Sequence, residues 1–310
     1  MRVWNPTIPV FITNRCEEER FFLLPKPETK AVILAWLAKA LAEHPGIQLH
    51  AYIFMSNHFH LLVTDPLGQL ADFMCYLQGQ MGRAINRDIL GERRGHFWSK
   101  SYSSIPVLTD ADFEERYAYI LTNPVKPGLV ARAEDSPFVS SYRQSFSELP
   151  LTCQWLDRTK RNDKGRGGRA VQDAECVEEL EIRLTLPPQW RKLSKSARAA
   201  RIAGLVKGME RRYGRLRAAE GRSVLGARRI LAQNPFMRPR NSARAPAPTV
   251  FCKDRELKET YIEGFKALFG LYREAFDGYV KASRKGRRPL VEWPPGTYPP
   301  SVSRPIGAPV

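Results

Sequence analysis

Residues 48–64, QLHAYIFMSNHFHLLVT, predict two antiparallel strands joined by a tight link. The segments 48–54 and 58–64 are rich in aromatic and aliphatic residues, and only the tripeptide MSN separates them. A link this short joins neighbouring strands into a hairpin. Because side chains alternate along a strand, His58 and His60 project from the same face of this hairpin.

The sequence on either side of the hairpin alternates between strand and helix patterns. Asp110 is the predicted N-cap of the last helix, which must end near Asn123 because Pro124 disfavours a helical residue before it. The predicted elements are strands at 9–15, 48–54, 58–64 and 102–107, helices at 28–43, 69–89 and 110–123, and a closing segment at 136–146. The order β-α-β-β-α-β-α predicts an α+β domain with a ferredoxin-like antiparallel sheet and packed helices.

Three regions follow from this pattern and from composition. Residues 1–150 form the predicted α+β domain, and residues 151–185, which contain the Gly-rich DRTKRNDKGRGGR, form a predicted linker. Residues 186–310 form a basic, mainly helical C-terminal extension with a Pro-rich tail. Its expected helices span about 194–213, 223–233 and 254–283. The paired helices around Gly214 and Gly226 are compatible with a helix-turn-helix-like unit.

The whole chain has a net charge of +17, and its basic residues are concentrated in the second half. Residues 1–150 contain 15 Lys and Arg against 16 Asp and Glu, and residues 151–310 contain the remaining 34 and 16. Between 186 and 245 there are 16 basic and two acidic residues. This excess indicates a polyanion, and we expect nucleic acid rather than a membrane, since the apolar residues there form no long stripe.

Composition excludes several classes of protein. Hydrophobic residues make up 43% of the chain, so a sizeable core can form. No stretch approaches the roughly 20 apolar residues of a membrane span, and MRVWNPTIPVF does not resemble a signal peptide. The five cysteines are scattered without a CxxC pair, which supports neither a zinc knuckle nor a disulfide framework. We therefore expect a cytoplasmic protein without a membrane partner.

The two histidines of the hairpin are candidate metal ligands. Two imidazoles on one face of a rigid strand suit a divalent cation, although a third ligand must come from elsewhere in the fold. The alternative is a pair of buried, hydrogen-bonded histidines. Taken alone, His58 and His60 leave both interpretations open.

Tyr119 and Asn123 are the second pair of candidates. They are four positions apart, so they share one face at the end of the predicted helix. A phenol near a metal-bound phosphodiester can attack phosphorus, and the Asn123 amide oxygen could complete the metal shell. The alternative is a core tyrosine beside a helix stop. Tyr117 is a competing nucleophile, but its neighbour four positions on is Leu121, which cannot bind a metal.

Two longer motifs carry a family resemblance. MSNHFHLLV (55–63) and YAYILTNPVKPGLV (117–130) together resemble the IS200-like single-tyrosine transposases with an HUH motif, and most of all the REP-associated tyrosine transposases. The likeness spans about 5–150 and includes FMCYLQGQMGRAINR, GHFWSKSYSS and SPFVSSYR. It implies the HUH endonuclease fold, and it implies an enzyme: a site-specific single-stranded DNA endonuclease and strand transferase.

The resemblance also implies a role for each site residue. His58 and His60 would hold Mg²⁺ or Mn²⁺ with Asn123 as third ligand, and Tyr119 would form a 5′-phosphotyrosine bond and leave a free 3′ hydroxyl. Some members carry a histidine where this chain has Leu121, which puts a proton-transfer role of that position in doubt. The implied setting is a bacterial cytoplasm, with the protein associated with the nucleoid.

The implied partner is single-stranded or hairpin DNA, bound by a monomer or a homodimer. Because residues 1–150 are nearly neutral, the DNA must be held by local patches or by the second half. Trp98 could stack on an unpaired base, although core packing is the alternative for it and for its neighbour Phe97. The expected DNA-binding residues are Arg15, Arg83, Arg87, Arg93, Arg94, Trp98, Lys100, Arg211 and Arg212. A non-catalytic nucleic-acid-binding protein, of DNA or less favourably of RNA, remains the alternative function.

Overall fold

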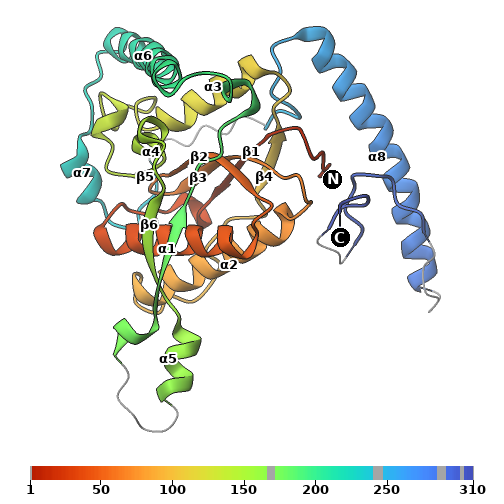
Figure 1. Ribbon diagram of the computed structural model, residues 1–310, viewed down its shortest axis with the longest axis horizontal. Coiled ribbons are helices and arrows are strands. Elements are labelled where there is room, and N and C mark those ends of the chain that lie inside the picture. The colour runs from red at the N-terminus through yellow and green to blue at the C-terminus, as the bar shows by residue number, and fades with distance from the viewer. Residues whose placement is uncertain (1, 166–171, 240–246, 285–290, 301–303, 310) are drawn as a thin grey trace.

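The hairpin lies at the centre of a five-stranded antiparallel sheet in the computed structural model, which describes residues 2–165, 172–239, 247–284, 291–300 and 304–309 (Figure 1). The strands are β1 (Val10–Arg15), β2 (Gln48–Phe54), β3 (His58–Thr64), β4 (Ser103–Pro106) and β5 (Val139–Ser140). Their order is β4-β1-β3-β2-β5, and each neighbouring pair is antiparallel. The first four strands have the predicted ferredoxin-like order, and the segment expected to close the domain adds β5 at the edge.

Helices α1 (Pro27–Glu43) and α2 (Leu70–Asp88) cover one face of the sheet. Pro27 begins α1, where its missing N–H costs nothing. Phe59, Leu61 and Val63 of β3 join the core beneath these helices, as the alternation along the strand predicts. The same alternation turns His58 and His60 to the opposite face.

That opposite face is covered by α3 (Asp110–Leu121) and, above it, by α6 (Lys195–Ala219) from the extension (Figure 1). Trp190 joins them: its Nε1 donates to Oε1 of Glu114 at 2.9 Å, and the Arg201 guanidinium pairs with the same carboxylate at 2.7 Å. The predicted N-cap of α3 was wrong by one residue, because the Thr109 hydroxyl accepts from the Asp112 N–H at 3.1 Å.

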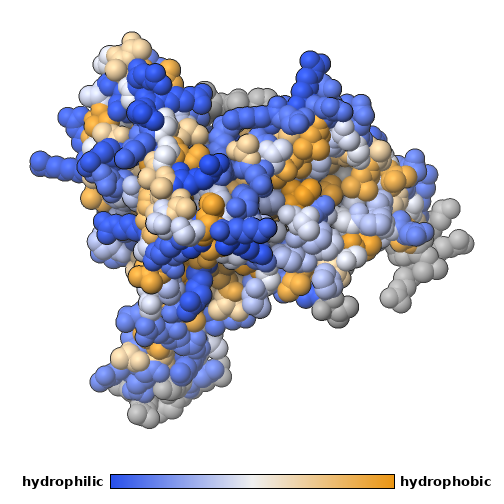
Figure 2. Space-filling model, turned by 45° about the horizontal axis from the view of Figure 1, so that its top comes forward, coloured by the Kyte–Doolittle hydropathy of each residue, from blue (hydrophilic) through white to orange (hydrophobic). Residues whose placement is uncertain are grey.

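The predicted linker contains an ordered hairpin, which is a correction to the sequence analysis. Strands β6 (Leu151–Leu156) and β7 (Val177–Ile182) pair along their whole length, and α5 (Arg158–Gly165) follows β6. The base of the hairpin packs on α1, and Cys153 and Ile182 enter the core there. Its far end projects from the body and is largely hydrophilic on the face seen in Figure 2.

The remaining extension follows the predicted helices less closely. Gly214 lies inside α6 and α7 is only Ala227–Leu231, so the helix-turn-helix-like unit is not formed. Helix α8 (Arg255–Arg284) contains no buried residue. The tail returns to the N-terminus, where the Trp4 N–H donates to the Gly296 carbonyl at 2.8 Å. None of the helices within the described ranges is long and apolar enough to cross a membrane.

Short elements complete the description of the chain. They are the 3₁₀ turns Glu17–Glu19, Ala133–Asp135, Asp173–Cys176 and Pro188–Trp190, and the helix α4 (Tyr142–Ser147).

Candidate active site

The two histidines lie side by side on the sheet face beneath α3. Their ring centroids are 5.0 Å apart. Nδ1 of His58 is 2.7 Å from the Asn57 side-chain oxygen; if Nδ1 carries the proton, Nε2 has the lone pair that a metal could bind. His60 is 7% exposed, and neither of its ring nitrogens has a hydrogen-bond partner within the described part of the chain. A buried imidazole without partners is costly, and metal coordination would satisfy one nitrogen.

Tyr119 and Asn123 meet these histidines from the end of α3. The Tyr119 ring centroid is 5.5 Å from that of His60. Asn123 follows the C-cap of α3, is 4% exposed, and its amide is close enough to influence the pKa of both His58 and Tyr119. The four residues singled out in the sequence therefore form one cluster.

Burial sets the protonation of this cluster. It lowers the pKa of His58 to about 4, and the positive charge of Arg15 adds to this effect while the Asn123 amide opposes it. Burial, and then the neighbouring His58, hold the pKa of His60 well below its usual value. Burial also raises the pKa of Tyr119 against the opposing contact with Asn123. Near neutral pH both imidazoles are uncharged, which is the form that binds metals, and the phenol keeps its proton.

Two basic side chains that the sequence analysis missed flank the phenol. The guanidinium carbon of Arg116 lies 5.4 Å from the centroid of the Tyr119 ring, and Nζ of Lys126 lies 5.3 Å from it. Arg116 stands three residues before Tyr119, on the same helix face, so helical spacing alone could have identified it. The site therefore combines buried imidazoles with two cations beside the hydroxyl-bearing ring.

The C-terminal extension also reaches this cluster, and no sequence signal predicted this. Phe251 forms an isolated parallel bridge with Val107, the residue that follows β4, and its ring lies 5.5 Å from that of Phe11. The Arg116 guanidinium stacks over Phe251 at 4.4 Å. On α6, Tyr213 lies close enough that ionised Tyr119 would raise its pKa, although burial is the larger cause of that rise.

Tyr117 is not placed to compete with Tyr119. It is 3% exposed, packs 4.9 Å from the Trp190 ring and lies in hydrogen-bonding reach of Ser145. Leu121, in the slot where some relatives carry histidine, is buried in the same core. Neither side chain belongs to the cluster around His60.

The expected DNA-binding residues do not form one surface. Arg15 lies opposite His58 in the β1–β3 register, so it borders the cluster. Trp98 instead packs on the helix side of the sheet, 5.2 Å from Phe59, and its Nε1 donates to the Gln78 carbonyl at 2.9 Å. Phe97, which is 6% exposed, belongs to this core, whereas Trp98 is only partly buried against it, so the stacking role of Trp98 stays a prediction.

The other expected basic residues occupy three places. Arg83 and Arg87 line a hollow between α1, α2 and the β6–β7 hairpin. Arg93 stacks 4.5 Å from the Phe22 ring centroid. The four remaining residues are exposed and belong to neither of these two places: Arg94, Lys100, Arg211 and Arg212. The last two lie on α6 beside Tyr213.

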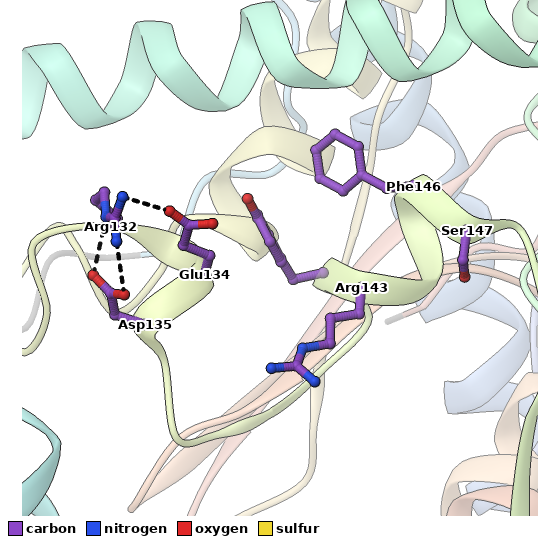
Figure 3. Close-up of a pocket in the computed structure, with 7 residues that line it drawn as sticks. Arg132, Glu134, Asp135, Arg143, Phe146 and Ser147 are labelled. Atoms are coloured by element: carbon purple, nitrogen blue, oxygen red, sulfur yellow. Dashed lines mark hydrogen bonds and ion pairs between the residues drawn. The ribbon is translucent and has the colours of Figure 1, made fainter.

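A wide surface hollow lies apart from this cluster. It has a volume of about 650 Å³ and is lined by Arg132, Glu134, Asp135, Tyr142, Arg143, Phe146 and Ser147. Figure 3 shows that Arg132 turns toward Glu134 and Asp135, which neutralise it at 2.8 and 3.2 Å. None of the predicted site residues lines this hollow, so we place the candidate chemistry at the histidine cluster.

Comparison with known proteins finds similarity within the predicted α+β domain, residues 1–150. Residues 16–123 match the family model described as Transposase IS200 like. A REP-associated tyrosine transposase candidate of Haemophilus influenzae is 27% identical over 120 residues, which are 36% of this chain and 68% of that protein.

Two solved structures are also similar. One is a REP-associated tyrosine transposase bound to a REP hairpin, with a TM-score of 0.41 and 20% identity over 47% of this chain and 84% of that chain. The other is a transposase candidate from Deinococcus radiodurans, with a TM-score of 0.29 and 18% identity over 39% of this chain and 93% of that chain. The family match and the Haemophilus relative confirm the resemblance: residues 16–123 are similar to IS200-like transposases.

Proposed function

We propose that this protein cleaves and rejoins single-stranded DNA through a covalent bond between Tyr119 and a 5′ phosphate. One observation carries the proposal: the Tyr119 ring lies 5.5 Å from that of His60, which lies 5.0 Å from that of His58, so the nucleophile and the candidate metal ligands form a single cluster. A core tyrosine beside a helix stop would not require this convergence.

The residues present fit a divalent cation. His60 has two buried nitrogens without partners in the described chain, His58 can offer Nε2 when Nδ1 donates to Asn57, and Asn123 next to His58 offers an amide oxygen. No group of three His, Cys, Asp or Glu side chains suited to a metal occurs among the described residues, so the amide is the third ligand we propose. Bound Mg²⁺ or Mn²⁺ would polarise a phosphate oxygen.

The chain's own residues account for the covalent step. The Tyr119 oxygen forms a bond to phosphorus, the bond from phosphorus to the 3′ oxygen breaks, the phenol proton passes to solvent and the released 3′ oxygen takes up a proton. The products are a 5′-phosphotyrosine and a 3′ hydroxyl. Rejoining reverses these changes, so the reaction needs no hydrolytic base. Arg116 and Lys126 would stabilise negative charge on the phosphate and on the departing phenolate.

DNA affinity would come mainly from the basic extension. Helix α6 lies over α3 and carries exposed Arg211 and Arg212 next to Tyr213. Because α6 adjoins the helix that bears Tyr119, phosphates bound along it would lie beside the cluster. We therefore propose that a single strand, or the foot of a DNA hairpin, runs along α6 to the end of α3, where it meets the histidines.

The experiment that tests this is detection of the adduct. The full-length protein is incubated with single-stranded hairpin oligonucleotides and Mg²⁺ or Mn²⁺, and covalent protein–DNA species are resolved on a denaturing gel. We expect an adduct that disappears with EDTA and in Tyr119→Phe. Tyr117→Phe is the matched control, since it removes a hydroxyl from the same helix but from the far side of the cluster, and it should form the adduct.

Two results would overturn the proposal. One is an adduct that persists in Tyr119→Phe, which would place the nucleophile elsewhere. The other is DNA binding without an adduct on any substrate, which would favour the alternative of a non-catalytic nucleic-acid-binding protein.

A further inference from the structure

The hollow beneath the β6–β7 hairpin has the composition of a nucleotide site. It lies between α1, α2 and the root of α5, with a volume of about 270 Å³. Three aromatic side chains line it, namely Trp36, Tyr76 and Trp155. This volume is just below the roughly 300–1,000 Å³ of sites for drug-sized ligands, which suits a single base.

The aromatic rings form an open-sided cluster. The Trp36 ring meets Tyr76 at 6.2 Å and Trp155 at 5.8 Å, both edge to face. Trp36 and Tyr76 are half-buried, so part of each ring remains free to contact a ligand, while Trp155 is only 9% exposed and forms the inner wall. Base stacking on such rings is tolerant of sequence, because every base has a π face.

Trp155 also carries an unused donor. Its Nε1 is buried and has no hydrogen-bond acceptor within the described residues. A buried indole N–H normally finds a partner, and the carbonyl oxygen of a bound base would supply one. Nζ of Lys39 lies 4.4 Å from the centroid of the Trp155 ring and pairs with Glu43 at 3.0 Å and Glu178 at 3.8 Å, so it adds no net charge there.

Three arginines surround the mouth of the hollow. Arg87 and Arg158 share one carboxylate, that of Asp88, at 2.8 Å each. Arg83 is exposed, and no ion pair of it occurs among the described residues. The three guanidinium groups outnumber the two carboxylates of Asp88 and Asp157, so the mouth keeps a net positive charge. Guanidinium groups bind phosphate well, because their N–H groups can donate two parallel hydrogen bonds to it.

We propose that this hollow binds an unpaired nucleotide of DNA, with its base among the three aromatic rings and its phosphate at the arginines. The identity of the polymer rests on the proposed function. The hollow lies on the α1–α2 side of the sheet and the histidine cluster on the α3 side, so a strand that fills both must pass around an edge of the sheet (Figure 1). The β6–β7 hairpin of the protein would thus be a second point of contact for the DNA that Tyr119 cuts.

The test uses full-length Tyr119→Phe protein in EDTA, so that no strand is cut. Binding of a fluorescent oligothymidine of about ten nucleotides is followed by anisotropy at several salt concentrations. Arg83→Ala should weaken binding by about five-fold or more and lower the slope of log K against log salt by about 0.7, the value for one phosphate contact on a single strand. Tyr76→Ala should weaken binding similarly without changing that slope. Arg132→Ala, which removes an exposed arginine outside the extension and outside both proposed sites, is the matched control.

A second measurement locates the contact. Oligonucleotides with 5-iodouracil are photo-cross-linked, and the modified peptides are identified by mass spectrometry. Peptides containing Trp36, Tyr76 or Trp155 are expected. Cross-links confined to other segments, affinity for Arg83→Ala equal to the parent, or tighter binding of the matching oligouridine RNA would overturn the inference.

Failure of the nucleotide site and failure of the proposed DNA cleavage give different results. An adduct on Tyr119 with unaltered binding by Arg83→Ala overturns the nucleotide site alone. Cross-links in the hollow without an adduct on any substrate overturn the proposed chemistry alone.

Discussion

Asn123 lies one helical turn beyond Tyr119, and its amide counteracts the rise that burial causes in the Tyr119 pKa and the fall that it causes in the His58 pKa. If it binds the metal, Asn123→Ala removes one of three protein ligands. We expect the Mn²⁺ concentration for half-maximal adduct formation to rise by about 10- to 100-fold. Asn123→Asp keeps an oxygen ligand and should retain most of the affinity. Equal Mn²⁺ dependence of Asn123→Ala and the unsubstituted protein would exclude this ligand role.

The cations beside Tyr119 give a second prediction. Arg116→Ala and Lys126→Ala should each slow adduct formation by about 10-fold or more. This is less than the roughly 10²–10³-fold loss for a buried oxyanion donor, because Lys126 is exposed and Arg116 already pairs with Glu115 at 2.6 Å. Rates are measured in single-turnover gel assays. Arg132→Ala removes a surface arginine whose charge Glu134 and Asp135 already neutralise, so it should leave the rate unchanged. A similar loss in that control would indicate a general charge effect instead.

Phe251 tests whether the extension is part of the catalytic domain. Its half-buried ring contacts Phe11 and Arg116, so Phe251→Ala should lower the free energy of unfolding by about 2 kcal/mol, less than for a fully buried phenylalanine. Urea unfolding measures this. Phe269 is 39% exposed on α8, and Phe269→Ala should change stability by less than about 0.5 kcal/mol. Equal effects of the two substitutions would contradict a structural role for residue 251.

His50 predicts a dependence of stability on pH. Its ring is buried between the Thr185 carbonyl and the Thr64 hydroxyl, and burial lowers the pKa to about 4. The unfolded chain therefore binds a proton between about pH 6.5 and 4 that the folded chain does not, so stability falls as pH falls through this window. The contribution is at most about 1.4 kcal/mol per pH unit.

The measurement is the urea midpoint at several pH values in this window. His50→Gln should be less stable near neutral pH, because two hydrogen bonds are altered, yet lose less stability on acidification. A slope equal to that of the unsubstituted protein would assign the pH dependence to other groups.

Much of the catalytic half follows from local pattern. Alternation along 58–64 predicts which face carries the histidines, and apolar spacing predicts α1 and α2 to within one residue at each end. The β6–β7 hairpin was missed although Leu151, Cys153 and Trp155 alternate with polar residues, because the Gly-rich basic stretch after them dominated the composition. Local pattern could not predict the contacts of Phe251 and Tyr213 with the site, since these depend on long-range packing.

The contacts of Glu114 have a consequence for synthesis of the chain. Its partners Trp190 and Arg201 lie 76 and 87 residues further on. At about 5–20 residues per second, the ribosome adds those 87 residues in roughly 4–17 s. During that interval α3 has formed but its outer face lacks α6, so the helix bearing Tyr119 stays uncovered on the nascent chain until the extension emerges.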